Sequence, residues 1–325
     1  MKVYVTGASG FVGAHVGRAL EQAGHEIRTE RADLLDPAAL ERAIDGCEAV
    51  VHVAALYSYD ADDAAVEAVN VTGTGNVLAA CRRRGVRRLV HTSTAGTCGP
   101  VRGREATEDD GPPGWELEVP YKRTKLAAER LVMAAARDGL DAVVVNPTTP
   151  VGPGDRKPTP TGRMVAGVAR GRVRAFVGTT GLNVVDVADV ARGHVLALER
   201  GRRGERYLLG GLNLTLRDLF AAIADAAGRP RPRLRVPYGF AAAAAMLGLA
   251  NRHEVRLARL PMFFSHEKAR RELGYRPGPV DEALVAAARE ALARESGRCL
   301  VYAPSRRDRR SAAPPRAAPA MPSRK

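Results

Sequence analysis

The sequence predicts an α/β protein in which a doubly wound parallel sheet is covered by helices on both faces and is followed by a smaller, mostly helical part. Short valine-rich segments alternate with helical stretches through the first half of the chain, and a glycine-rich turn follows the first of them. From residue 155 onward, proline-rich loops and helical segments replace this alternation. Apolar strands separated by helices are typical of parallel sheets that are buried on both faces.

The expected elements of the first domain, residues 1–154, follow one another in a regular order. The first strand is "KVYVTG" at 2–7, and the helix "GAHVGRALEQAG" ends at Gly24. A short, polar second strand is expected at 24–31 and a third strand at 47–55. A helix at 68–85 closes at a glycine, which is a common helix end. Further strands are expected at 86–94 and 141–154, with a helix at 121–138 between them.

Residues 155–297 are expected to form a substrate-binding part, with a helix near 163–171. Within this range, the segment 183–200 is expected to return to the first domain. The apolar run "FAAAAAMLGLA" at 240–250 is too short to span a bilayer. It predicts a buried helix or a lid helix, with peripheral membrane contact as the alternative.

The formal net charge of the 325 residues is +14, and its distribution is uneven. Residues 298–325 hold seven Arg and one Lys against one Asp, a net charge of 8 − 1 = +7. Their Pro- and Ala-rich composition predicts a disordered basic tail. Such a tail can contact anionic surfaces, but we expect no specific nucleic-acid partner.

The four cysteines are widely spaced, without a CxxC pair or a Cys/His cluster. We therefore expect neither a metal site nor a disulfide framework, and a reducing cytoplasm is favoured. The N-terminus lacks the pattern of a signal peptide, and no transmembrane segment is expected.

The stretch "VTGASGFVG" predicts a phosphate-binding turn. Gly7, Gly10 and Gly13 follow a strand directly and open a helix. Glycines at this spacing let the backbone turn tightly and approach a pyrophosphate, whose charge is met by amides at the helix N-terminus. The sequence therefore predicts a dinucleotide bound by a Rossmann-type first domain.

The stretch "VPYKRTKLAAE" places Tyr121 and Lys125 four positions apart in a predicted helix. Their side chains therefore share one face of that helix. The pattern is weak by itself, because a charged, solvated helix face would carry it equally well.

Five motifs in order resemble those of the extended short-chain dehydrogenases/reductases. They are "TGASGFVG", "HVAA" at 52–55, "NVTGTGNVL" at 70–78, "HTSTAGTCG" at 91–99 and "YKRTK" at 121–125. This family includes NAD(P)-dependent sugar epimerases, dehydratases and dihydroflavonol reductase-like enzymes. "VVNPTTPVGPGDRKPTPTGRM" and "MFFSHEKARRELGYRP" are most similar to the hopanoid-associated sugar epimerases, a dihydroflavonol reductase-like branch. Only the basic tail lies outside the resemblance.

The resemblance implies that Tyr121 exchanges a proton with the substrate oxygen. It also implies that Lys125 holds the nicotinamide ribose and, as an ammonium, lowers the pKa of Tyr121. Thr94 takes the place of the third catalytic residue, a hydroxyl that bonds the substrate oxygen, with Ser93 as the alternative. The residues after Thr94 are Ala-Gly, where sugar 4,6-dehydratases of the family carry Asp-Glu, so a 4,6-dehydratase is not expected.

The cofactor contacts also follow from the resemblance. Asp33 and Leu34 match a pair that meets the adenine. Asn70 resembles an Asn that bridges the sheet to the active site, with a plain role at a helix start as the alternative. The full predicted set consists of the turn after the first strand, the ends of later strands and the catalytic pair: Gly7, Ser9, Gly10, Phe11, Val12, Gly13, Arg31, Asp33, Leu34, Ala54, Ala55, Tyr121, Lys125, Pro147 and Thr149.

The choice between NADP and NAD depends on the segment after the second strand. An acidic residue there binds the adenosine ribose of NAD, whereas an arginine accommodates the phosphate of NADP. Arg28, Glu30 and Arg31 all occur within four positions, and the two arginines favour NADP. The segment "RTERADLLD" is abbreviated relative to the family.

Three functions remain open at this point. The first is a sugar epimerase, which removes a hydride and returns it to the other face of the substrate, in hopanoid side-chain biosynthesis. The second is a dihydroflavonol reductase-like NADPH-dependent ketone or aldehyde reductase. The third is a dinucleotide-sensing regulator, which the retention of both Tyr121 and Lys125 disfavours. Lys157 and Arg163 are candidates for contact with a polar group of the substrate.

The resemblance further implies a homodimer in which the helices at 70–85 and 121–138 of two subunits pair. Alanines on these helices would permit a close approach: Ala79, Ala80, Ala127, Ala128 and Ala135.

Overall fold

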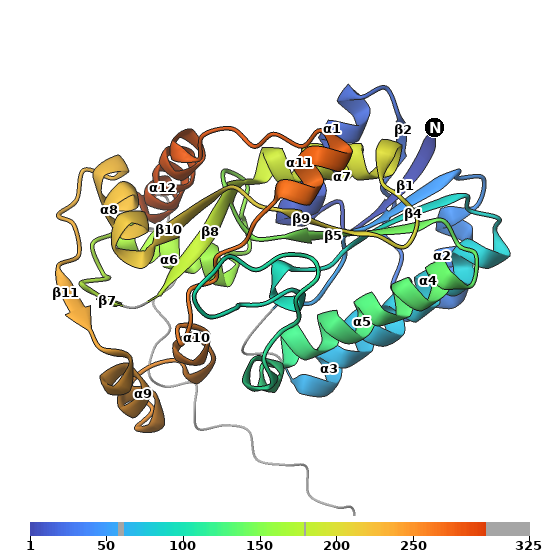
Figure 1. Cartoon of the computed structure of the whole chain (residues 1–325). Coiled ribbons are helices and arrows are strands. Elements are labelled where there is room, and N and C mark those ends of the chain that lie inside the picture. The colour runs from blue at the N-terminus through green and yellow to red at the C-terminus, as the bar shows by residue number, and fades with distance from the viewer. Residues whose placement is uncertain (58–61, 179, 297–325) are drawn as a thin grey trace, which may run out of the picture.

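The computed structural model describes residues 1–57, 62–178 and 180–296 (Figure 1). The predicted basic tail at 298–325 lies outside the described residues. The central layer is a six-stranded sheet in the order β2-β1-β3-β4-β5-β9, in which every neighbouring pair is parallel. Its strands are β1 (Lys2–Thr6), β2 (Glu26–Arg28), β3 (Ala49–His52), β4 (Arg88–Thr92), β5 (Ala142–Pro147) and β9 (Arg206–Leu209). The predicted fold class is confirmed.

The strand order reverses at β1, which has β2 on one side and β3 on the other. In open α/β sheets, ligands bind beyond the carboxyl ends of the strands at such a point. The β2 strand is a three-residue edge strand, and residues 29–36 after it form neither strand nor helix before α2 (Pro37–Ile44). The abbreviated segment of the sequence is therefore a direct path from the sheet edge to Asp33.

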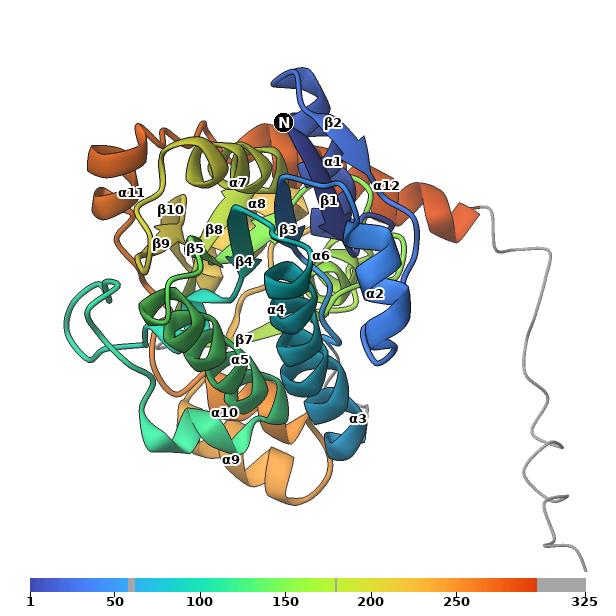
Figure 2. The ribbon, with the colours of Figure 1, turned by 90° about the vertical axis from the view of Figure 1, so that its right-hand side faces the viewer.

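Helices cover both faces of this sheet, as Figures 1 and 2 show. One face carries α1 (Phe11–Gln22), α7 (Val187–Arg200) and α11 (Glu267–Leu273), and the other carries α2, α4 (Gly73–Arg83) and α5 (Pro120–Arg137). Side chains alternate between the two faces of a strand. Val3 and Val5 accordingly join the first core and Tyr4 joins the second.

The second part of the chain has a core of its own. A three-stranded sheet, β10-β8-β6, packs with α6 (Pro160–Ala169), α8 (Leu216–Ala226) and α12 (Asp281–Ser296). The strands are β6 (Thr149–Val151), β8 (Gly181–Asp186) and β10 (Leu212–Thr215). A two-stranded sheet of β7 (Ala175–Val177) and β11 (Leu234–Val236) leads to α9 (Tyr238–Met246) and α10 (Arg252–Leu257). The predicted domain boundaries assigned residues 206–209 to this second part. The structure shows that they form β9, the last strand of the main sheet.

Two expectations about helix surfaces were wrong. Ala80, Ala128 and Ala135 are at most 4% exposed and pack inside the subunit, so they cannot contact a partner. The α9 helix is not a buried helix, since Phe240 and Met246 are 73% and 79% exposed, which leaves a lid helix and peripheral membrane contact as the predicted alternatives. None of the helices in the described ranges combines the length and the apolar composition that a membrane crossing requires.

Three histidines are buried in the main domain, His52 in β3, His91 in β4 and His194 in α7, and burial holds them neutral. The His52 ring bonds Thr6 Oγ1 at 2.8 Å, and the His194 ring bonds Thr92 Oγ1 at 2.9 Å. His91 lies beside His52, with the ring centroids 5.2 Å apart. Desolvation lowers the pKa of His52 to about 3 and that of His194 to about 4.

These histidines predict acid sensitivity of the fold. A histidine in the unfolded chain has a pKa of about 6.5. Below that pH its imidazole is protonated in the unfolded chain but stays neutral in the folded chain. The free energy of unfolding should fall by about 1.4 kcal/mol per pH unit for each of His52 and His194 as the pH is lowered from about 6.5 to about 4. Denaturant titrations at pH 7 and pH 5 measure this loss. A His194→Gln variant should lose less on acidification than the natural chain, and an equal loss would contradict the assignment.

Candidate active site

A cavity of about 1080 Å³ lies at the carboxyl ends of the main strands. Its wall includes residues that follow four neighbouring strands: Gly7 after β1, Arg31 after β2, Ala54 after β3 and Ser93 after β4. The predicted residues of the catalytic and cofactor sets, from the glycine turn through Thr94, Tyr121 and Lys125 to Thr149, all line this cavity. The structure therefore brings the whole set together.

The glycine turn has the geometry that a pyrophosphate requires. Gly7 has φ +69°, and a Cβ there would meet the Ala54 backbone at 2.8 Å. A Cβ on Gly13 would lie 2.1 Å from the Gly7 carbonyl oxygen, so only glycine lets α1 pack this closely on the turn. No side chain caps the first amides of α1, which leaves them to a bound anion.

The edge of the sheet offers one arginine to the cavity. Arg31 lines the cavity, whereas the Arg28 guanidinium is held by the Glu30 carboxylate and by the Asp45 carbonyl. The negative charge of Glu30 is thereby paired with the positive charge of Arg28, and Arg28 does not line the cavity. Leu34 is 7% exposed, and its carbonyl accepts a hydrogen bond from Asn76 Nδ2 at 2.8 Å.

The α5 helix presents Tyr121, Lys125 and Glu129 along one face. Lys125 is 2% exposed, and its Nζ donates a hydrogen bond of 2.5 Å to the Thr92 carbonyl. Burial lowers the pKa of Lys125 to about 8. The Tyr121 ring packs on the Tyr57 ring, with their centroids 4.3 Å apart.

Burial also raises the pKa of Tyr121 above its usual value, and the neighbouring Tyr57 adds to the rise. We had expected Lys125 to lower this pKa. Desolvation is the largest cause of this rise, and it pushes both Tyr121 and Lys125 toward their neutral forms. The phenol of Tyr121 is therefore held in its neutral form.

The two candidate hydroxyls differ in their partners. Thr94 Oγ1 accepts a hydrogen bond from the Gly96 amide at 3.2 Å and faces the cavity. Ser93 also lines the cavity, but it is only 4% exposed and its Oγ has no partner among the described residues. Both remain available to a substrate oxygen.

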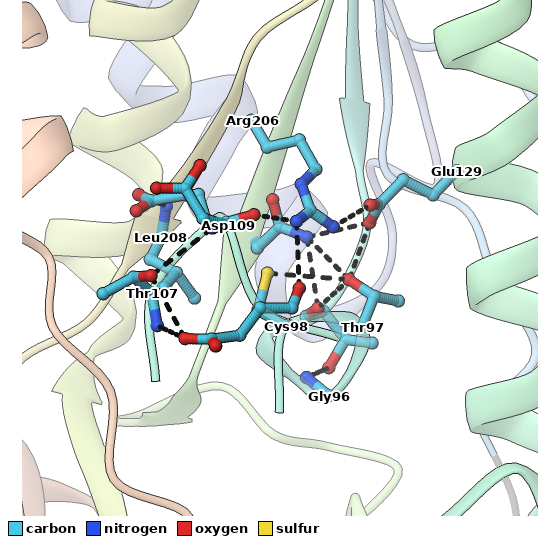
Figure 3. A network of polar contacts seen from close by, with 12 residues as sticks. Gly96, Thr97, Cys98, Thr107, Asp109, Glu129, Arg206 and Leu208 are labelled. Atoms are coloured by element: carbon cyan, nitrogen blue, oxygen red, sulfur yellow. Dashed lines mark hydrogen bonds and ion pairs between the residues drawn. The ribbon is translucent and has the colours of Figure 1, made fainter. Parts of the chain in front are cut away.

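A buried polar network holds the strand ends to α5 (Figure 3). Glu129 forms an ion pair with Arg206 of β9 at 2.8 Å and accepts hydrogen bonds from Thr97 and Asn146. Asn146 Nδ2 also donates to the Thr94 carbonyl at 3.2 Å, and Thr97 Oγ1 lies 2.8 Å from the same carbonyl, so its single proton can serve either that carbonyl or Glu129. The network therefore fixes the Thr94 backbone relative to the helix that carries Tyr121.

Asn70 connects a loop to α5, as an Asn bridging the sheet and the site would. It is 2% exposed, its Oδ1 accepts from the Leu56 amide at 2.8 Å, and its Nδ2 donates to Thr124 Oγ1 at 3.1 Å. Asn70 lies in the π-helical turn η1 (Ala68–Thr72), and such turns are frequent at functional sites.

Sequence reasoning missed several residues of the site. Lys122 lines the cavity and forms a buried ion pair of 2.6 Å with Glu116. Glu129 could have been found, because it continues the four-residue spacing of Tyr121 and Lys125. Arg206 gave no such signal, since it lies 77 positions further along the chain.

The remaining wall of the cavity is mostly apolar. Large side chains of α6, β7, α8 and the segment after α10 line it: Met164, Phe176, Phe220, Met262 and Phe264. Of the two basic residues predicted as candidates for substrate contact, Arg163 lines the cavity and Lys157 does not.

Comparison with known proteins agrees with this geometry. The model of the NAD dependent epimerase/dehydratase family matches residues 3–210. The sterol demethylase protein B of Methylococcus capsulatus is 35% identical over 309 residues, which cover 85% of this chain and 94% of that protein. The 2-alkyl-3-oxoalkanoate reductase of Stenotrophomonas maltophilia is 35% identical and covers 85% and 95%.

A crystal structure of a nucleoside-diphosphate-sugar epimerase from Pseudomonas aeruginosa is 31% identical, with a TM-score of 0.77. The similarity covers 91% of this chain and 98% of that chain. The family predicted from five sequence motifs is confirmed. The chain belongs to the NAD dependent epimerase/dehydratase family and is an NAD(P)-dependent oxidoreductase of that family.

Proposed function

We propose that this protein is an NADP(H)-dependent reductase that converts a ketone to a secondary alcohol on a largely apolar substrate. The proposal is based on the residues that line the cavity. Its wall combines the glycine turn and Arg31 with the hydroxyl, phenol and ammonium of Thr94, Tyr121 and Lys125. The rest of the wall is mostly aromatic and aliphatic, with Lys122, Arg163 and Glu254 among its charged residues, and its apolar part suits an apolar substrate.

The residues have distinct roles in this proposal. The bound nicotinamide supplies the hydride. Thr94 donates a hydrogen bond to the substrate carbonyl oxygen, and Tyr121 gives that oxygen its proton. Lys125 binds the ribose and stabilises the phenolate that Tyr121 leaves behind. The raised pKa keeps Tyr121 neutral, the form in which its hydroxyl can donate a proton.

The names of two relatives support an apolar substrate with a carbonyl. Sterols and 2-alkyl-3-oxoalkanoates both carry extended hydrocarbon parts, and the second relative is named as a reductase. A substrate of that kind would bury its hydrocarbon against Phe176, Phe220 and Met262, which is favourable by about 25 cal/mol per Å² of apolar surface.

The second candidate is the sugar epimerase implied by the resemblance, in hopanoid side-chain biosynthesis. The Pseudomonas aeruginosa structure bears such a name, and Arg163 offers the cavity one cation for a phosphate or a sugar hydroxyl. The two candidates differ in redox balance. The epimerase returns its hydride to the substrate, whereas the reductase consumes one NADPH for each product molecule.

Assembly and location also remain proposals. Ala79 and Ala127 are partly exposed on α4 and α5, and Leu131 of α5 is 39% exposed, so a homodimer would use these outer positions. The buried thiols of Cys47, Cys81 and Cys98 suit a cytoplasmic protein.

Replacing the phenol of Tyr121 tests the proposed proton donor. Tyr121→Phe keeps the ring that packs on Tyr57 and removes the hydroxyl. Turnover of an apolar ketone should fall by about 10²–10⁴-fold, the usual contribution of general acid catalysis, while the affinity for NADPH is retained. Tyr238→Phe, the same change on α9, should leave turnover as it is. Equal activity of Tyr121→Phe and the natural chain would refute the role.

Arg31 and Arg28 form a matched pair for cofactor choice. Arg31→Ala should weaken NADPH binding by roughly tenfold or more, because a charged hydrogen bond to the ribose phosphate is worth about 1.5–3 kcal/mol, and should leave NADH binding nearly unchanged. Arg28→Ala should change both affinities much less, since its guanidinium bonds Glu30 and Asp45. Calorimetric titration of each variant with both cofactors measures these affinities. Selective loss of NADPH binding in Arg28→Ala would contradict this reading of the edge strand.

A further inference from the structure

The chain exposes an unusual concentration of large apolar side chains around α9. We define this apolar patch as Leu234, Phe240, Met246, Leu247 and Leu249, which are 62–79% exposed. Four other large apolar side chains of the described residues are also exposed, and these are scattered: Met1, Leu35, Leu131 and Leu212. Soluble surfaces tolerate single apolar residues, but a cluster of this kind marks an interaction site.

The composition of α9 strengthens this conclusion. Its sequence, "YGFAAAAAM", is apolar on every side, and a helix of that kind is normally buried. Here only Ala245 is buried, and the helix packs chiefly on α10 (Figure 1). Nothing in the helix itself provides a polar face toward water.

Arginines are frequent in the segments of the chain that carry the apolar patch. Residues 228–262 contain seven Arg and one Glu, a formal charge of 7 − 1 = +6. Arg229, Arg233, Arg235 and Arg252 are exposed on the segments that flank α9. Arg231 and Arg256 form ion pairs with Asp225 and Glu118, so part of the charge is compensated within the chain. The uncompensated part would attract a negatively charged surface.

We propose that this face docks on the surface of an anionic lipid bilayer. The apolar patch enters the boundary between headgroups and acyl chains, and the flanking arginines contact lipid phosphates. Apolar residues flanked by Lys or Arg are the chemistry of peripheral membrane segments. The α9 helix of nine residues is about 13 Å long, so it lies in the interface and does not cross it.

The α10 helix contacts both the docking helix α9 and the active-site cavity. Glu254, Val255 and Leu257 of α10 and Ala258, the residue after it, line the active-site cavity, while α9 packs on α10. An apolar substrate could thus pass between the bilayer and the cavity without crossing water. This consequence rests on the proposed function, whereas the docking itself does not.

Co-sedimentation of the full chain with vesicles tests the docking. Vesicles of equal parts phosphatidylcholine and phosphatidylglycerol should bind the natural chain, and pure phosphatidylcholine vesicles should bind it far less. Leu249→Ser should weaken binding to the mixed vesicles by roughly tenfold or more, because an exposed leucine would no longer leave water. Leu212→Ser, the same change at a 54% exposed leucine of β10, should bind as the natural chain does.

A second pair of variants tests the charges. Arg229→Ala with Arg233→Ala should weaken binding by roughly tenfold or more. Arg203→Ala with Arg289→Ala removes the same charge from exposed positions elsewhere and should have little effect. All these variants keep residues 298–325, so any attraction of that basic segment is constant across them.

Three results would overturn the proposal. The first is that the natural chain fails to bind the mixed vesicles. The second is that Leu249→Ser binds them as well as the natural chain does. The third is a dimer in light scattering that Leu249→Ser converts to a monomer, which would show that a second copy covers the apolar patch. Because vesicle binding needs no turnover, it can succeed or fail independently of the proposed reductase activity.

Discussion

The active site depends on the buried ion pair between Glu129 of α5 and Arg206 of β9. Glu129 is 3% exposed, and its carboxylate also accepts hydrogen bonds from Thr97 and Asn146. These contacts join the ends of β4, β5 and β9 to the helix that carries Tyr121 and Lys125. A buried ion pair of this kind adds little net stability, but loss of one partner leaves an uncompensated charge at a cost of about 3–5 kcal/mol. Its value here is geometric, since it sets the distance between the Thr94 segment and α5.

Burial is the second constraint, and it acts on the reacting groups themselves. Desolvation lowers the pKa of Lys125 to about 8 and raises that of Tyr121. The same removal of water makes the apolar wall of Phe176, Phe220 and Met262 a favourable surface for hydrocarbon. A site that keeps its phenol protonated and its walls dry suits the donation of a proton to a ketone oxygen. That combination supports the proposal of a reductase, whereas the sequence alone placed the epimerase first.

Much of the cofactor half of the site could be predicted from the sequence, because local spacing determines it. The glycines of the first turn and the pair Tyr121 and Lys125 each lie within a few residues of one another, and helix or turn geometry then fixes their relation. The contribution of Arg206 could not be predicted, because β9 reaches the sheet only after the second part of the chain has begun. The roles of Ala80, Ala128 and Ala135 were misjudged for a related reason. Small residues suit close packing against the sheet as well as against a partner, and sequence spacing does not separate the two.

The redox balance of turnover tests the reductase account most directly. Steroid ketones, 2-alkyl-3-oxo acids and nucleoside-diphosphate sugars, each incubated with the protein and NADPH, allow product and remaining NADPH to be quantified together by mass spectrometry and absorbance. The account predicts that an apolar ketone is converted to its alcohol with one NADPH oxidised for each product molecule. Conversion of a sugar to its epimer with the NADP(H) pool unchanged, and no reduction of any apolar ketone, would contradict it.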